Sequence, residues 1–299
     1  MRDRRTPLRL MAWNLCQGGR GTPAGDSLDL IAEQIAAVDA DVVFCTETAG
    51  ATERIVDACR AAGRADCRGH RLSADDADDN LAIVTHLPVV ARMPYPAGRT
   101  VDSYNVGGLR LRLPGGRDIA VFDTWLRFDV EIVEALEGAA AEVATGRRRT
   151  RTDEDLALLE LPQLANVEEI LSEYLPAMVP DSATPVIIAG GLNTESHLDS
   201  VRADLPYRPQ WQVTRRLAKA GFLDTFRAAH PDPEAVPGGT YDALDPDQRL
   251  PHRIDYVLAG GAGIEVVDAR VLDGRLPEHG PGPFYSDHAA LVVDLLIAE

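Results

Sequence analysis

Cysteine is scarce in this sequence: only four occur among 299 residues, at Cys16, Cys45, Cys59 and Cys67, and no two of them form a C-x-x-C pair. A scaffold held together by disulfides needs more cysteines at a more regular spacing. The sequence therefore excludes a disulfide framework. Cys16 and Cys45 lie in or beside apolar runs, so we predict that they are small core residues.

Long hydrophobic runs are also absent from the sequence. No stretch approaches the roughly 18 apolar residues that a membrane-spanning helix requires. The first residues, MRDRRTPLRLMAWNL, contain neither the apolar segment nor the cleavage site of a secretion signal. We therefore predict a cytoplasmic protein that does not contact a membrane.

Positive charge is in deficit, because 30 lysines and arginines face 47 aspartates and glutamates and leave a net charge of −17. A protein that binds long nucleic acid usually presents a basic surface to the phosphates. The acidic balance argues against long DNA and favours a small substrate, or one whose charge a metal ion screens. The sequence also lacks a P-loop, a dinucleotide-binding fingerprint and the G-x-S-x-G of a serine nucleophile.

The sequence does contain enough apolar residues, 45% of the chain, to build a large core. Short apolar segments predict strands, and several of these strands are separated by segments of helical periodicity. Strands are predicted at 8–15, 41–45, 81–86, 108–113, 118–126, 185–189, 253–259 and 291–296, and helices at 26–38, 52–62, 163–174 and 212–220. This pattern predicts the α/β class, with two β-sheets packed together and helices outside them.

Residues 127–161 differ in composition from the rest of the chain. They are rich in alanine and glutamate and contain the only basic run, around Arg148. We expect an inserted helix with a mobile loop, within a single domain that spans residues 1–299. Two hypotheses fit Arg148: the basic run is a lid that grips substrate phosphate, since arginine forks match phosphate oxygens, or it is a solvated loop.

Polar residues follow several predicted strands at the points where these strands end. They are Asn14, Glu47, Asn193, Asp255 and the pair Asp287-His288. Strand ends at one rim of a sandwich converge in space, so we expect one site. Carboxylates in such places are good ligands for hard cations, and Glu47 and Asp287 together would hold a Mg²⁺ (or Mn²⁺) ion that keeps several waters. Either residue alone would also suit an ordinary loop.

In this order along the chain, the motifs resemble those of the endonuclease/exonuclease/phosphatase superfamily, the group related to DNase I, sphingomyelinases and inositol polyphosphate phosphatases. The resemblance spans the whole chain and rests on the segments AWNLCQGG, DVVFCTET, NLAIVTHLPV, GGLNTESHLDS, GFLDTFR, HRIDYVLA and YSDHAALVV. It implies a four-layer α/β sandwich in which helices flank two packed, mainly antiparallel sheets. It also implies a divalent-metal-dependent hydrolase of phosphoesters.

The resemblance implies roles for individual residues. Glu47 and Asp287 would form the metal site, and Asn14 would orient water or phosphate beside Glu47. Asn193 would bind phosphoryl oxygens and the attacking water, and Asn80 would contact the substrate.

His288 would contact the scissile phosphate, and Asp255 would hold the His288 imidazole in one tautomer. The implied chemistry is an in-line displacement at phosphorus, in which the cation screens the charge that develops on the oxygens.

Two positions depart from the family pattern. The family loop G-D-x-N reads Gly190-Gly191-Leu192-Asn193 here, so the carboxylate that orients and deprotonates the nucleophilic water is absent at Gly191. The family's T-H-L reads Thr124-Trp125-Leu126, so Trp125 replaces a phosphate-contacting histidine. The loss of a general base typically costs about 10²–10⁴ in rate.

Asp123 and Trp125 lie two positions apart on a predicted strand, so their side chains face the same side. Asp123 would then supply the missing carboxylate, or it is an ordinary strand-end residue. Trp125 is either a core aromatic or the floor of a pocket for an apolar or ring-bearing substrate. Glu195 and His197 are weaker candidates, because loop and helix-cap roles suit them better.

Three functional hypotheses follow. The first is a metal-dependent phosphoester hydrolase with an altered water-activating site. The second is a repurposed metal-dependent biosynthetic enzyme, for example one that activates a carbonyl. The third is a non-catalytic protein that binds a ligand in the old cleft. The retained motif residues favour the first hypothesis, and Gly191 and Trp125 count against it.

Overall fold

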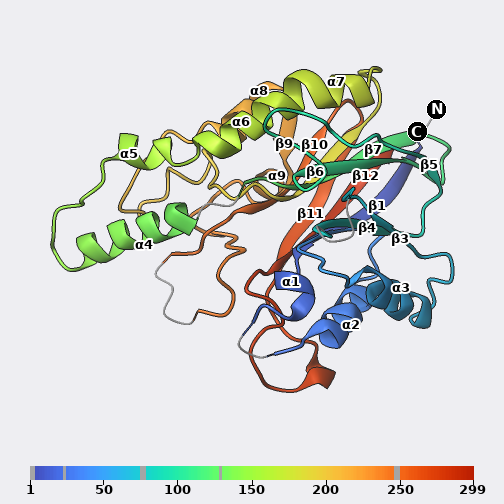
Figure 1. Ribbon diagram of the computed structural model, residues 1–299, viewed down its shortest axis with the longest axis horizontal. Coiled ribbons are helices and arrows are strands. Elements are labelled where there is room, and N and C mark those ends of the chain that lie inside the picture. The colour runs from blue at the N-terminus through green and yellow to red at the C-terminus, as the bar shows by residue number, and fades with distance from the viewer. Residues whose placement is uncertain (1–3, 23–24, 75–78, 128–129, 246–249) are drawn as a thin grey trace.

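Two six-stranded sheets pack face to face in the computed structural model, and helices cover their outer faces (Figure 1). The structure describes residues 4–22, 25–74, 79–127, 130–245 and 250–299. The predicted α/β sandwich is therefore confirmed. Within the described residues, no helix is long and apolar enough to cross a lipid bilayer.

Sheet A contains strands from both ends of the chain. Its order is β11 (Ile264–Leu272), β12 (Ala290–Ala298), β1 (Arg5–Asn14), β2 (Val42–Thr46), β4 (Leu81–Thr85) and β3 (Arg68–Arg71). Only β1 and β2 run parallel; the other neighbours are antiparallel.

Sheet B is built from the middle of the chain. Its order is β5 (Val89–Arg92), β6 (Val106–Arg112), β7 (Asp118–Trp125), β8 (Val186–Gly191), β10 (Asp255–Gly260) and β9 (Phe222–Asp224). Here β7 and β8 form the parallel pair. Both sheets are thus mainly antiparallel.

Strand β1 shows why the sequence contains wholly apolar runs. Leu8 and Leu10 face the core between the two sheets, whereas Met11 and Trp13 face the helices outside sheet A. Successive strand residues point to opposite faces. Because both faces of sheet A are covered, the apolar and polar residues of β1 do not alternate.

Helices cover the outer faces of both sheets (Figure 1). Buried residues of α2 and α3, such as Ile31 and Ile55, pack on sheet A, and Val167 and Val213 belong to the apolar cluster outside sheet B. The helices are α2 (Leu28–Val38) and α3 (Thr52–Ala61) on sheet A, and α6 (Leu161–Glu169), its π-helical continuation η1 (Ile170–Tyr174), α7 (Leu175–Met178) and α8 (Val213–Lys219) on sheet B.

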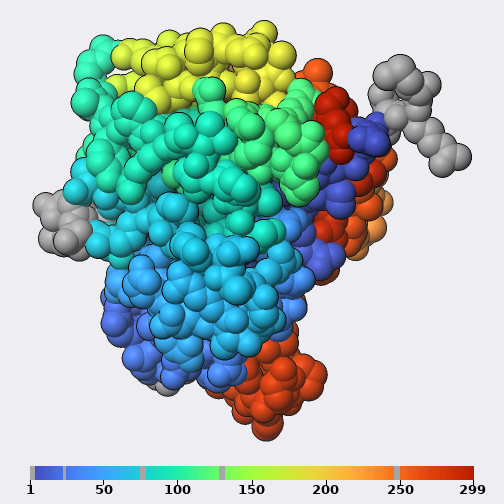
Figure 2. Space-filling view, turned by 90° about the vertical axis from the view of Figure 1, so that its right-hand side faces the viewer, coloured from blue at the N-terminus to red at the C-terminus, as the bar shows by residue number. Residues whose placement is uncertain are grey.

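The segment predicted as an insertion forms two helices, α4 (Val130–Ala144) and α5 (Asp153–Leu158), that extend away from the sheets (Figure 1). They have an apolar cluster of their own, in which Leu136 and Leu156 pack with Trp211. Figure 2 shows a face without these helices, where the loop around η2 (Pro277–His279) protrudes at the lower edge.

A buried cluster of ion pairs fixes the start of β10. Arg253 lies 2.8 Å from Asp199 and 2.8 Å from Asp224, and Arg227 of α9 (Thr225–Ala229) lies 2.5 Å from Asp199. Buried charges of this kind are stable only when they are paired. The cluster therefore holds the strand that begins at Asp255 in a defined position.

Candidate functional site

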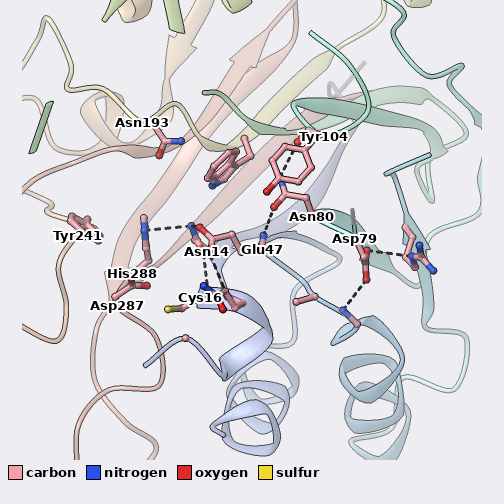
Figure 3. Close-up of a pocket in the computed structure, with 16 residues that line it drawn as sticks. Asn14, Cys16, Glu47, Asp79, Asn80, Tyr104, Asn193, Tyr241, Asp287 and His288 are labelled. Carbon is pink, nitrogen blue, oxygen red and sulfur yellow. Dashed lines mark hydrogen bonds and ion pairs between the residues drawn. The ribbon is translucent and has the colours of Figure 1, made fainter. Parts of the chain in front are cut away.

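One cavity of about 870 Å³ lies at the rim of the sandwich where the predicted strand ends meet (Figure 3). Segments far apart in the sequence line it. Of the residues predicted from the sequence, it brings together Asn14, Glu47, Asn80, Trp125, Asn193, Asp287 and His288. Asp255 lies behind His288 and bonds to it.

The backbone around this cavity adopts an uncommon conformation. Among the described residues, six other than glycine have a positive φ, and five of these line the cavity. The five are Cys16 (49°), Gln17 (57°), Glu47 (52°), Ala49 (42°) and Asn193 (53°). Each such residue costs about 1–3 kcal/mol and persists only where its surroundings impose it, which is typical of functional sites.

The Glu47 carboxylate is held by groups at the end of β1 and directly after it. The Asn14 side-chain amide donates a hydrogen bond to Glu47 Oε1 at 2.8 Å, and the backbone N–H of Gln17 donates to Glu47 Oε2 at 3.3 Å (Figure 3). The Cys16 N–H donates to Asn14 Oδ1 at 2.9 Å and fixes the amide. The left-handed turn α1 (Cys16–Gly19) therefore orients both side chains.

Asn80 lines the cavity, but its amide is engaged on both sides. Its Oδ1 accepts from the Glu47 N–H at 3.2 Å, and its Nδ2 donates to the Tyr104 carbonyl at 2.8 Å (Figure 3). The Asn80 side chain is only 2% exposed. Asn80 thus links the backbone of Glu47 to that of Tyr104, a positioning role that the sequence did not reveal.

His288 and Asp255 form a buried pair. His288 Nδ1 donates to Asp255 Oδ2 at 2.7 Å. The other ring nitrogen, Nε2, faces Asn14 and lies 3.4 Å from the Asn14 amide nitrogen. Burial lowers the pKa of His288, but the nearby carboxylates of Asp255, Asp287 and Glu47 outweigh burial and raise the pKa to about 9. These carboxylates therefore favour the imidazolium form of His288.

Gly191 and Trp125, the two positions that we expect to depart from the family pattern, are neighbours in space. Trp125 pairs with Gly191 across β7 and β8, and Gly191 pairs with Asp255 across β8 and β10. A Cβ atom at Gly191 would lie 3.4 Å from Trp125 Cδ1, Asn193 Oδ1 and Asp255 Oδ1. The indole thus borders the space that a side chain at Gly191 would occupy.

Asp123 does not reach this cavity. Its side chain is 0% exposed and lies one pleat deeper than Trp125, where a Cβ at Gly190 would stand 2.8 Å from Asp123 Oδ1. Burial raises the pKa of Asp123 well above its usual range and favours the neutral acid. Asp123 is therefore buried away from the cavity in which a replacement base would have to act.

Arg148 is exposed and does not line the cavity, so the solvated-loop alternative fits it better than a phosphate-gripping lid. Glu195 and His197 also have structural roles. His197 bonds to Thr214 of α8 through its backbone N–H (2.9 Å) and its ring (2.8 Å), and Glu195 bonds to His252.

Several residues that line the cavity were not predicted from the sequence. They are Cys16, Gln17, Arg71, Asp79, Tyr104 and Tyr241. Arg71 pairs with Asp79 at 3.3 Å on one wall, and the Tyr241 ring lies 4.8 Å from that of His288 on another. The CQGG turn was a signal for Cys16 and Gln17, but no local pattern marks Tyr104 or Tyr241.

A buried histidine connects the α4 helix to the site. His252, 0% exposed, lies 2.9 Å from Glu137 of α4 and 2.7 Å from Glu195, two residues after Asn193. Its backbone also pairs with that of Tyr241. Burial lowers the pKa of His252, but the two carboxylates raise it to about 9.

This arrangement predicts that the protein loses stability as the pH rises from about 6.5 to about 9. A raised folded-state pKa stabilises the protonated form fully below the unfolded value near 6.5, and this stabilisation, about 3 kcal/mol, disappears once the pH passes 9. Denaturant unfolding across this range should show a smaller loss for Glu137→Gln than for the wild type. The exposed Glu134 of the same helix provides the control, Glu134→Gln; equal losses in all three proteins would contradict the prediction.

Known proteins are similar to this chain in sequence and in fold. The model of the endonuclease/exonuclease/phosphatase family matches residues 11–288. An uncharacterised protein from Caenorhabditis elegans is 30% identical over 131 residues, which cover 37% of this chain and 40% of that relative.

Solved structures share the fold at low sequence identity. An endonuclease/exonuclease/phosphatase from Beutenbergia cavernae is 20% identical, with a TM-score of 0.62 over 98% of this chain and 72% of that chain. The human Nocturnin catalytic domain with bound sulfate is 16% identical, with a TM-score of 0.61 over 98% and 95%. An AP endonuclease from Archaeoglobus fulgidus is 17% identical, with a TM-score of 0.58 over 96% and 98%.

Proposed function

Because the chain belongs to the endonuclease/exonuclease/phosphatase family, we propose that it is a divalent-metal-dependent hydrolase that cleaves a phosphoester of a small or metal-screened substrate. One observation carries the proposal: Glu47, Asp287 and His288 line a single cavity, and Asp255 holds the His288 ring. Family membership supports phosphoesterase-type hydrolysis, and the acidic charge of −17 favours a small substrate.

The donor set suits a hard cation. Glu47 and Asp287 are carboxylates that line the same cavity, and two hydrogen bonds hold the Glu47 carboxylate, whose backbone is left-handed. Among the described residues, no group of three or more His, Cys, Asp or Glu side chains is placed to bind an ion. Two carboxylates with several retained waters are typical of Mg²⁺, and Mn²⁺ has similar preferences.

The chain's own residues would bind and orient the phosphoryl group. His288 would donate from Nε2 to a phosphoryl oxygen, while Asp255 fixes its ring and stabilises the imidazolium. Asn14 and Asn193 would orient the substrate and the attacking water. A bound divalent ion would supply the screening of charge that develops at phosphorus. Since Gly191 supplies no carboxylate, we expect slower hydrolysis than with a general base in place.

Two measurements on the purified protein test this proposal. Isothermal titration with Mg²⁺ and Mn²⁺ should show binding, and bis-p-nitrophenyl phosphate should be hydrolysed in the presence of the metal and not in the presence of EDTA. Absence of metal binding would contradict the proposal and favour a non-catalytic binding protein.

A repurposed enzyme is the second candidate, and the adjacency of Trp125 and Gly191 is the observation that favours it. Two neighbouring changes remove the water-activating carboxylate and the phosphate-contacting histidine, yet leave Glu47 and Asp287 in place. Metal binding without hydrolysis of the phosphodiester would support this candidate over the first.

Asp255→Asn should lower kcat about 10–100-fold, because the His288 ring loses the partner that sets its tautomer. Metal affinity measured by calorimetry should change little, since Asp255 does not line the cavity. The exposed Asp57 of α3 provides a matched control, Asp57→Asn. An unchanged kcat in Asp255→Asn would remove His288 from the proposed mechanism.

A further inference from the structure

A second cavity, of about 430 Å³, adjoins the candidate site. Tyr104 and Trp125 line both cavities. Their rings pack edge to face, with centroids 5.5 Å apart and planes at 88°. Aromatic residues make up only 5% of the chain. One of them, Tyr104, is 38% exposed at this cavity. The two rings therefore form an aromatic wall, Tyr104 and Trp125, that the cavities share.

The two cavities differ in charge. The first contains the carboxylates of Glu47, Asp79 and Asp287, whereas the described lining of the second contains Arg99 and Arg127 and no carboxylate. Two arginines without an acidic lining residue stand out in a chain with a net charge of −17. Guanidinium groups match phosphate and carboxylate oxygens, so this cavity favours an anion.

Both arginine side chains are exposed, but Arg127 has the better fixed backbone. The side chain of Arg99 is 84% exposed and lies 3.3 Å from Glu173, which is also exposed. Such surface pairs contribute little and leave the side chain mobile in water. Arg127 follows the buried Leu126, and its backbone N–H donates to Asn166 Oδ1 at 3.1 Å.

Residues 125–127 connect the two cavities, and hydrogen bonds on both sides fix their backbone. The Asn193 side chain donates to the Leu126 carbonyl at 2.6 Å, so the loop that contains Asn193 is tied to the residue between Trp125 and Arg127. Asn166, only 3% exposed, fixes the backbone of Arg127 on the other side. One ligand can therefore meet the phosphoryl site, the aromatic wall and Arg127, whose exposed side chain extends from a fixed backbone.

We propose, on the basis of the proposed function, that the substrate is a phosphoester that carries a planar ring and a second anionic group. The scissile phosphoryl group binds beside Glu47, Asp287 and His288. The ring packs against Trp125, where a flat indole borders the cavity in place of the family's hydrogen-bonding histidine. The second anionic group binds Arg127 in the adjoining cavity. Replacement of histidine by tryptophan thus changes which ligands the site accepts.

Calorimetry in the presence of Mg²⁺ tests the ring and the second anion separately. The probes are adenosine 3′,5′-bisphosphate, adenosine 5′-monophosphate and ribose 5-phosphate. The bisphosphate should bind at least about tenfold more tightly than the monophosphate, as one charge-assisted contact provides. Arg127→Gln should remove this difference. Trp125→Ala should reduce the preference for adenosine monophosphate over ribose 5-phosphate by about tenfold.

Arg147→Gln, at an exposed arginine outside both cavities, is the control and should bind all probes as the wild type does. Circular dichroism would show that each variant is folded. A bisphosphate that binds the wild type no more tightly than the monophosphate, or a preference that survives Arg127→Gln, would overturn the proposed ligand class.

Turnover of bis-p-nitrophenyl phosphate in the same preparations separates the two proposals. Metal-dependent turnover without a bisphosphate preference would leave the hydrolase proposal standing and overturn the ligand class. A bisphosphate preference that depends on Arg127, without any turnover, would support the ligand class and contradict hydrolysis.

Discussion

Glu47→Gln should lower metal-dependent turnover of bis-p-nitrophenyl phosphate by about 10³-fold or more. A metal ion contributes several kcal/mol of charge stabilisation at phosphorus, and each 1.36 kcal/mol corresponds to a factor of ten. Glutamine keeps the size of the side chain but supplies a neutral oxygen in place of a carboxylate. Asn14 and the Gln17 N–H both donate hydrogen bonds to Glu47. The amide N–H₂ of glutamine would therefore face another donor instead of an acceptor. Mg²⁺ affinity measured by calorimetry should fall by more than about tenfold.

The matched control is Glu53→Gln, at an exposed glutamate in the first turn of α3. It removes the same charge from the same part of the chain without touching the cavity, so both the turnover and the metal affinity should stay at wild-type levels. If Glu47→Gln binds Mg²⁺ as tightly as the control, Glu47 is not a metal ligand and the proposed mechanism is wrong.

The central strands could be predicted because they are buried on both faces. The segments around Leu10, Phe44 and Val121 are continuous apolar runs, and burial between a second sheet and a helical layer explains why. Strands at the sheet edges were missed. Eight of the nine residues of β11 are exposed or only partly buried, and so are all four residues of β5, so neither strand carries a buried apolar run. β5 pairs with β6 and β11 pairs with β12, each across a long connection, and local composition does not encode such pairing.

The site could be predicted where each residue has a local signal, namely a polar residue at the end of an apolar strand. Glu47, Asp287 and His288 have this signal and do meet. How deep a side chain lies below the rim of the sandwich has no such signal in the sequence. Asp123 shares the strand face of Trp125, yet one pleat of the strand places it inside the core. Tyr104 joins the site through a hydrogen bond from Asn80, a contact between residues 24 positions apart.

The side chains that Gly191 can be replaced with depend on Trp125, because the two residues are neighbours. A side chain at Gly191 would start 3.4 Å from the indole, an ordinary contact for Cβ, but the carboxylate beyond it would have to share space with Trp125 and lie close to Asp255. Histidine in place of Trp125 would free that space and could donate a hydrogen bond to phosphate. The two substitutions should therefore act together rather than additively.

We accordingly expect that Gly191→Asp alone raises turnover of bis-p-nitrophenyl phosphate less than about tenfold, whereas Gly191→Asp combined with Trp125→His raises it about 10²-fold, the lower range of general-base catalysis. Steady-state kinetics of the wild type, both single variants and the double variant form a double-mutant cycle that measures the coupling. A full gain from Gly191→Asp alone would contradict the steric coupling. A folded double variant that binds Mg²⁺ but gains no turnover would show that this cavity no longer serves phosphoester hydrolysis, and would favour the repurposed enzyme.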